Sequence, residues 1–233
     1  MRSTEGELSL LKLFRPDLLS PHEFTTLGRV RELELLEQLR AEGIIAFKRS
    51  GTVVKDGGRY PYALLEYIPG NSLEAYLSVE SFSLYSEVVD FAIHLLQSLR
   101  TLHLHYDSLV LNGLNLESIF IDARGEELRP VLIDLGHTLS TQLTHQGCQI
   151  LKLSTLNLAY VANECFNQAY SIKSDLYSLA VVLYRLIYGR LPWTICSDAP
   201  AGSKEEQELW REARRHRLTF PEEGKELIGY EER

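Results

Sequence analysis

The 233-residue sequence has few cysteines, no excess of positive charge and no long hydrophobic run. Cys148, Cys165 and Cys196 are widely spaced, which argues against a thiolate metal site and leaves one cysteine over in any disulfide framework. With 24 Lys plus Arg against 32 Asp plus Glu, the formal charge is -8, so we expect no nucleic-acid partner. The apolar stretches are interrupted well short of a membrane span, so we expect no membrane partner either.

The rest of the composition is that of an ordinary globular protein. Hydrophobic residues make up 45% of the chain and aromatic residues 9%, which is enough to bury a core. The N-terminus leads directly into polar residues, without the apolar core of a signal peptide. Together with the odd number of cysteines, this favours a reduced compartment, and we expect a cytoplasmic protein.

The first part of the chain predicts a small antiparallel sheet with one helix. Residues 8–14 are mostly apolar and predict a short strand. Ser20 begins a helix-start signature, with proline next and a glutamate placed for a capping box, and we expect a helix to follow as far as Gly43. Residues 44–54 and 60–68 predict the two strands of a hairpin, joined by a turn that contains glycine.

The second part begins after a Pro-Gly-Asn-Ser cluster at 69–72 and is predicted to be mainly helical. It contains a long run with helical apolar spacing, two short apolar runs that predict another hairpin, and a helix that is apolar on nearly every face. Such a helix is expected to be buried all round. A charged segment near the C-terminus predicts a surface helix. These elements cover, in order, residues 88–102, 119–122 with 130–134, 176–188 and 205–217.

Several short motifs follow one another in a fixed order along these elements. They comprise a strand lysine, a helix glutamate, a chain connector, an Asp-Leu-Gly after a strand, and three segments in the helical part. Their positions are 9–12, Glu32, 64–67, 134–136, 160–164, 175–179 and 188–193. Each motif is weak alone, but their joint order and spacing resemble the eukaryotic-type protein kinases over almost the whole chain.

The resemblance implies an α+β, protein-kinase-like fold with two lobes. Residues 1–70 would form a small antiparallel-sheet N-lobe with one long helix and the hinge, and residues 71–233 a mainly helical C-lobe. Both lobes are expected to be incomplete, because the chain starts at the end of the family's second strand and lacks its last helices. We therefore expect that another chain or domain can complete the fold.

The resemblance also implies a vestigial nucleotide site. Lys12 would contact the phosphates and pair with Glu32, and Asp134 would bind a metal ion only if a nucleotide binds. The Lys12–Glu32 pair can equally be a structural relic, and Asp134 can equally cap a turn. The residues implied at this site are Lys12, Glu32, Leu65, Glu66, Tyr67 and Asp134.

The same alignment implies losses in the catalytic loop. Gly113 stands where the family has the aspartate that accepts the proton of the substrate hydroxyl, and glycine has no side chain to do so. Ser118 stands at the metal-binding asparagine and is a poorer ligand. Asn112 and Asn115 replace the family's arginine and lysine. No catalytic residue is therefore assigned.

Two further departures concern the nucleotide itself. No glycine-rich loop precedes Lys12, and Leu10 replaces the small alanine that lies against the adenine ring in the family. We expect no required cofactor, and ATP with magnesium is an alternative that these departures disfavour.

Two acidic residues and three histidines receive structural interpretations. The resemblance assigns Asp175 to backbone hydrogen bonds near the catalytic loop, and Glu164 to an ion pair with an arginine in the missing C-terminal part. His103, His105 and His137 have no partner at a diagnostic spacing, and we interpret them as surface or satisfied core residues.

The function that follows is that of a pseudokinase, an inactive kinase-like domain that binds a protein partner as a scaffold or allosteric regulator. The alternative is a weakly active or atypical ATP-dependent kinase or other transferase that uses Lys12, Glu32 and Asp134. A third hypothesis is a fragment of a larger kinase-like protein. The fold alone cannot decide between them, because function depends on the site.

Overall fold

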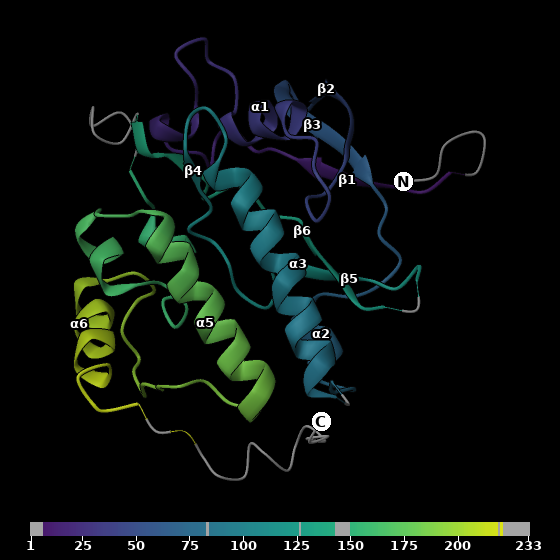
Figure 1. Cartoon of the computed structure of the whole chain (residues 1–233). Coiled ribbons are helices and arrows are strands. Elements are labelled where there is room, and N and C mark those ends of the chain that lie inside the picture. The colour runs from purple at the N-terminus through teal and green to yellow at the C-terminus, as the bar shows by residue number, and fades with distance from the viewer. Residues whose placement is uncertain (1–6, 83, 126, 143–149, 219, 221–233) are drawn as a thin grey trace.

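The computed structural model describes residues 7–82, 84–125, 127–142, 150–218 and 220 of the chain. Figure 1 shows a small sheet with one helix at one end of the molecule and a larger, mostly helical part at the other. Within these ranges, no helix combines the length and apolarity that crossing a membrane requires. The expected end of an earlier strand, upstream of residue 7, lies outside the described residues.

Three antiparallel strands form the sheet, in the order β1-β3-β2. They are β1 (Ser9–Leu13), β2 (Phe47–Lys55) and β3 (Gly58–Glu66). Asp56 and Gly57 join β2 to β3 with φ angles of 50° and 77°, the two positive values that a two-residue hairpin turn requires. The predicted hairpin is confirmed.

The first strand of that hairpin begins at Phe47, not at Ile44 as predicted. Ile44 and Ile45 are buried and leave the sheet to contact β6 (Arg129–Leu132) in the helical part. The Ile45 N–H donates to the Leu132 carbonyl at 3.0 Å, and Ile44 forms a parallel bridge with the same residue. The predicted strand 44–54 therefore divides: its first residues bond to β6 of the helical part, and its residues from Phe47 onward form β2.

The expected continuous helix from Ser20 to Gly43 is wrong. The predicted capping box is present, but it starts only a single 3-10 turn, η1 (Pro21–Glu23). Gly28 then adopts a φ of 74° in a turn, a conformation that an α-helix cannot contain. The true helix, α1 (Arg31–Gln38), begins after this turn.

α1 packs beside the sheet (Figure 1). Leu33 and Leu36 are buried, and Glu32 is buried beside them. The Arg40 guanidinium donates to the carbonyls of Leu36 and Leu39, each at 3.0 Å, which satisfies two carbonyls at the helix end. The helix therefore ends well before Gly43.

The remaining part contains four helices in the described ranges, two short antiparallel strand pairs and two 3-10 turns. The predicted long helix and the predicted second hairpin are confirmed. The helices are α2 (Leu73–Leu77), α3 (Tyr85–His103), α5 (Ile172–Tyr188) and α6 (Lys204–Ala213); the strand pairs are β4 (Leu109–Val110) with β7 (Leu139–Ser140) and β5 (Ile119–Asp122) with β6; the turns are η2 (Leu153–Thr155) and η3 (Asn163–Asn167).

The apolar helix α5 packs against α3 and is buried on most of its surface, but the expectation of burial all round is wrong. Leu176 keeps 44% of its surface exposed, and Ala180 on the same side is also exposed. Val182 and Asp175, on the opposite side, are completely buried. Exposed apolar side chains are common on globular surfaces, so the apolar composition of α5 was not sufficient evidence that every side of the helix is buried.

α6 confirms the predicted charged helix, but it is not merely a surface element. It ends at Ala213, before the predicted Arg217, and buries Trp210 to 6% exposure. Just after the helix, the Arg214 guanidinium lies over the Trp210, Tyr177 and Phe166 rings at 5.2–5.6 Å, so α6 is fixed to the helical core.

Candidate functional site

Lys12 lies at the centre of the candidate site. Side chains alternate between the two faces of a strand, so β1 places Leu10 and Lys12 on the same face, toward a cavity. The Lys12 ammonium pairs with Glu32 of α1 and, at 2.9 Å, with the carboxylate of Asp134. The structure thus contains the Lys12–Glu32 ion pair expected from the sequence and adds Asp134 to it.

Mutual attraction favours the charged forms of Lys12 and Asp134, whereas burial dominates at Glu32. Burial lowers the pKa of Lys12, but the two carboxylates outweigh it and raise the pKa above its ordinary value. Burial tends to raise the pKa of Asp134, but Lys12 and the Gly136 N–H hold it below the usual range. Burial raises the pKa of Glu32, although that carboxylate also accepts the Leu135 N–H at 3.2 Å.

A cavity of about 380 Å³ opens in front of Lys12. Its walls come from both parts of the molecule, and Leu65 lines it from β3. Leu10 also lines the wall and keeps 41% of its surface exposed, so the cavity stays open despite this larger side chain. The other lining residues are Leu11, Asn115, Glu117, Ser118, Ile133, Asp134, His137, Thr155, Leu156 and Asn157.

The loop that carries Gly113 and Ser118 is closed by its own hydrogen bonds. The Ser118 hydroxyl donates to the Asn115 carbonyl and accepts the Asn115 N–H, both at 3.0 Å. The Asn115 side chain in turn donates to the Gly113 carbonyl and accepts the N–H groups of Glu117 and Ser118. Ser118 is only 5% exposed, so its hydroxyl is committed to the loop.

The His137 ring occupies the space beside Gly113. A Cβ atom placed on Gly113 would lie 3.1 Å from Cδ2 of His137 and 3.4 Å from its Cβ. Burial lowers the pKa of His137, partly offset by Asp134, so the imidazole is neutral near pH 7. Sequence reasoning set His137 aside, although its place directly after residues 134–136 was a signal that it borders the site.

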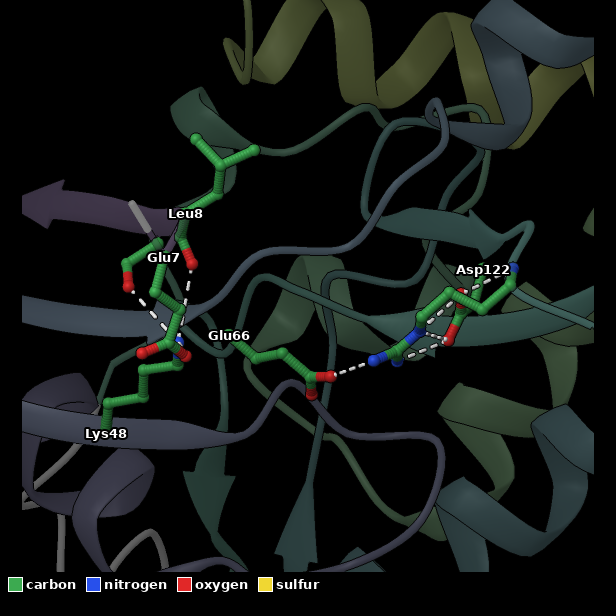
Figure 2. A network of polar contacts seen from close by, with 7 residues as sticks. Glu7, Leu8, Lys48, Glu66 and Asp122 are labelled. Carbon is green, nitrogen blue, oxygen red and sulfur yellow. Dashed lines mark hydrogen bonds and ion pairs between the residues drawn. The ribbon is translucent and has the colours of Figure 1, made fainter. Parts of the chain in front are cut away.

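The three predicted hinge residues point in different directions. Leu65 is completely buried and lines the cavity, whereas Tyr67 is 45% exposed. The Glu66 carboxylate pairs with Arg124, which also pairs with Asp122 at 2.5 Å (Figure 2). Glu66 therefore ties the end of β3 to the β5–β6 hairpin.

A second polar contact secures the start of the sheet. The Lys48 ammonium in β2 pairs with Glu7 at 2.5 Å and donates to the Leu8 carbonyl at 3.4 Å (Figure 2). This contact joins β2 to the residues just before β1, and Lys48 also donates to the Ser9 hydroxyl at the start of β1. It contributes little stability by itself, because Glu7 is largely exposed.

Asp175 holds the backbone that precedes the loop. Its carboxylate is completely buried and accepts the N–H groups of Leu111 and Asn112, each at 2.8 Å. His103 Nε2 lies 2.8 Å from the same carboxylate. These contacts agree with the structural role expected for Asp175 and make His103 a satisfied core residue.

Glu164 does not form an ion pair with an arginine in the part of the chain that the structure describes. Arg214 lies nearby, but its guanidinium donates to Asn163 Oδ1 and to the Leu158 carbonyl, each at 2.6 Å. Glu164 instead accepts the Ser174 hydroxyl at 3.5 Å. Sequence reasoning missed Arg214, because nothing in the charged α6 segment distinguishes one arginine as buried.

The described residues contain no cluster of three or more His, Cys, Asp or Glu side chains that could hold a metal ion. At the site, Asp134 is one carboxylate of suitable chemistry, and one of its oxygens already accepts Lys12. Because the Ser118 hydroxyl is used within its loop, the residues present do not fit a magnesium ion that needs both positions.

Comparison with known proteins places this geometry in a family. The model of the protein kinase domain matches residues 18–229. The chain is similar to the serine/threonine-protein kinase KIN4 of Saccharomyces cerevisiae, with 26% identity over 91% of this chain and 25% of that protein. It is also similar to the serine/threonine-protein kinase VIK of Arabidopsis thaliana, with 26% identity over 70% of this chain and 36% of that protein.

The serine/threonine-protein kinase Nek5 of Homo sapiens is 25% identical over 67% of this chain and 21% of that protein. The chain therefore spans about a fifth to a third of the length of these curated relatives. The match to the family model covers most of the chain, and the small sheet and the helical part agree with it. The chain belongs to the protein kinase domain family and has an α+β, kinase-like fold.

Proposed function

We propose that this chain is a catalytically inactive, protein-kinase-like domain that acts by binding a protein partner, as a scaffold or as an allosteric regulator. The observation that carries the proposal is the pairing of Gly113 with His137: the position of the proton-accepting aspartate has no side chain, and an imidazole fills the space beside it. Loss of a positioned general base slows a reaction by about 10²–10⁴-fold.

The second metal position supports the same proposal. Phosphoryl transfer in this family needs positioned metal ions that neutralise the developing charge. The Ser118 hydroxyl both donates to and accepts from the Asn115 backbone, so it is held within its own loop and not offered to a metal ion beside Asp134. We infer that no cofactor is required for the function, and that any bound nucleotide serves binding and not chemistry.

One observation favours a second candidate, a weakly active or atypical kinase or other transferase. Lys12, Glu32 and Asp134 lie in direct contact at an open cavity, and the relatives named above are serine/threonine-protein kinases. The same contact would also stabilise an inactive domain, because the three charged side chains link β1, α1 and the segment that follows β6. The contact therefore fits both candidates.

The proposed partner is a protein, because a formal charge of -8 disfavours nucleic acids and anionic membranes. The proposed compartment is the cytoplasm, since Cys165 and Cys196 are free thiols, as expected in a reducing environment.

A phosphotransfer assay tests the proposal. The purified chain is incubated with millimolar Mg-ATP labelled at the γ-phosphate and with a mixture of generic protein substrates. Parallel reactions contain Lys12→Met and Asp134→Asn as background controls. We expect incorporation by the wild type to equal that of both variants. Incorporation that disappears in Lys12→Met and Asp134→Asn would support the transferase instead.

A further inference from the structure

β1 is one of the two outer strands of the three-stranded sheet, whose order is β1-β3-β2. It pairs with β3 along its whole length, and among the residues that the structure describes no strand pairs with its other side. A strand in this position presents a row of backbone N–H and C=O groups with which another chain can pair. We call this side, from Leu11 to Leu13, the outer edge of β1.

The register of the sheet shows which backbone groups lie on the outer edge. The Phe14 N–H donates to the Pro61 carbonyl at 2.9 Å, so the backbone groups of Phe14 point toward β3. Successive residues of an antiparallel strand direct these groups to opposite sides. The N–H and C=O of Lys12 therefore point toward β3 as well, whereas those of Leu11 and Leu13 point outward.

The side chains along β1 are apolar and exposed. Leu8, Leu10, Leu11 and Leu13 each keep 39–48% of their surface exposed. Side chains alternate between the faces of a strand, so Leu11 and Leu13 project from the face opposite Lys12. A single exposed leucine is ordinary, but such a group on one outer strand forms an apolar patch of the kind that marks an interaction site.

The opposite outer strand of the same sheet, β2, is protected in the usual way. It carries three exposed cationic residues, Lys48, Arg49 and Lys55, and its register shifts near its start. Charged side chains and such irregularities prevent the edge of a sheet from pairing with other chains. The one charged residue of β1, Lys12, is instead engaged in ion pairs within the chain. The contrast indicates that the outer edge of β1 is suited to being covered.

We propose that an extended segment of the partner protein pairs with the outer edge of β1 as a fourth, antiparallel strand, with apolar side chains at alternate positions opposite Leu11 and Leu13. Hydrogen-bond complementarity selects a strand, because an extended chain supplies N–H and C=O groups at the spacing of these two residues. A second copy of this chain is a poorer occupant, because each copy carries a formal charge of -8. This inference rests on the proposed function and states where its protein partner binds.

Fluorescence anisotropy with two synthetic peptides tests the inference on the full chain. Both are short labelled peptides of alternating valine and threonine; one is N-methylated at every threonine and the other at every valine. When the valines lie opposite Leu11 and Leu13 in an antiparallel pair, the valine N–H groups face β1 and the threonine N–H groups face away. We expect saturable binding of the threonine-methylated peptide, and binding at least about tenfold weaker for the valine-methylated peptide.

Variants of the chain locate the binding. Leu13→Pro removes an outward N–H, a change that an outer strand tolerates, and should weaken the peptide at least about tenfold. The matched control is Val54→Pro in β2, where the register opposite Arg59 also turns the N–H outward, and it should leave binding unchanged. Hydrogen exchange on the wild type gives a test without a variant: the peptide should slow exchange of the Leu11 and Leu13 amides.

Equal binding of the two peptides, no binding of either, or unchanged exchange of the Leu11 and Leu13 amides would overturn the inference. A dimer of the chain alone in sedimentation velocity that Leu13→Pro dissociates would also overturn it, because the occupant would then be a second copy. Failure of the proposed function is distinguishable. A chain that binds the peptide and also transfers phosphate refutes inactivity but keeps the strand site, and a chain that does neither refutes the strand site alone.

Discussion

The imidazole of His137 packs against the backbone of Gly113, so that a Cβ atom on Gly113 would approach the ring to 3.1 Å. The two residues are 24 positions apart in the sequence. A side chain at position 113 would need the space that the His137 ring fills, so the presence of glycine at 113 and the position of the His137 ring are linked. The packing around Gly113 therefore leaves little room for a side chain at this position.

Gly113→Ala should destabilise the fold by about 1 kcal/mol, because the added methyl group crowds the imidazole in a packed site. His137→Ala removes the obstacle, so the double variant should be more stable than the sum of the single effects predicts. Urea unfolding of the four proteins measures this coupling. Gly125→Ala, where a Cβ atom meets only Glu127 N at 3.9 Å, is the control and should show no coupling to His137→Ala.

The pKa of His137 predicts a dependence of stability on pH. Since burial lowers the folded-state pKa of His137 below that of the unfolded chain, the unfolded state binds the proton more readily in mildly acidic solution. The stability contribution is fully present above about pH 6.5 and is lost as pH falls through the lower folded-state pKa. As the pH is lowered from neutral to mildly acidic, the urea midpoint of unfolding should fall less for His137→Gln than for the wild type. An equal fall for the two proteins would contradict this prediction.

Lys12→Met should destabilise the fold by about 2–3 kcal/mol, because it leaves the buried Glu32 carboxylate without its cation. Adding Glu32→Gln to that variant removes the unpaired charge and should recover much of the loss. The free energies of unfolding of the single and double variants provide the test. A double variant that is no more stable than Lys12→Met would show that the pair is not what stabilises this region.

Asp175→Asn should destabilise the fold by about 2–4 kcal/mol, because the completely buried carboxylate accepts two backbone N–H groups that an amide cannot satisfy equally well. The exposed Asp90→Asn, with the same chemical change, should shift stability by less than about 0.5 kcal/mol. Thermal unfolding of both variants distinguishes them. Similar shifts would contradict the structural role of Asp175.

The sequence predicted those parts of the site that depend on local pattern and motif spacing. Lys12, Glu32 and Asp134 were predicted from their order along the chain, and the structure brings them into contact. The helix expected from Ser20 was wrong, because its capping box is a local signal that cannot show where Gly28 redirects the chain.

What the sequence could not show depends on contacts between distant segments. His137 gains its importance only from lying against Gly113, and a histidine in a loop has no pattern that reveals its neighbour. Arg214 is likewise an ordinary arginine in a charged segment until its stacking on Trp210 is known. Contacts of this kind arise from tertiary packing and leave no periodicity in the sequence.

Under the proposed function, the loop from Gly113 to Ser118 does not support metal-assisted phosphoryl transfer. The most direct test is thermal unfolding with millimolar ATP in the presence of either magnesium or EDTA, because it reports on the metal position without knowledge of a substrate. A ligand at about 100 times its dissociation constant adds about 2.7 kcal/mol of stability. We predict that any stabilisation by ATP is the same with magnesium and with EDTA. A stabilisation that requires magnesium and is lost in Asp134→Asn would contradict the account.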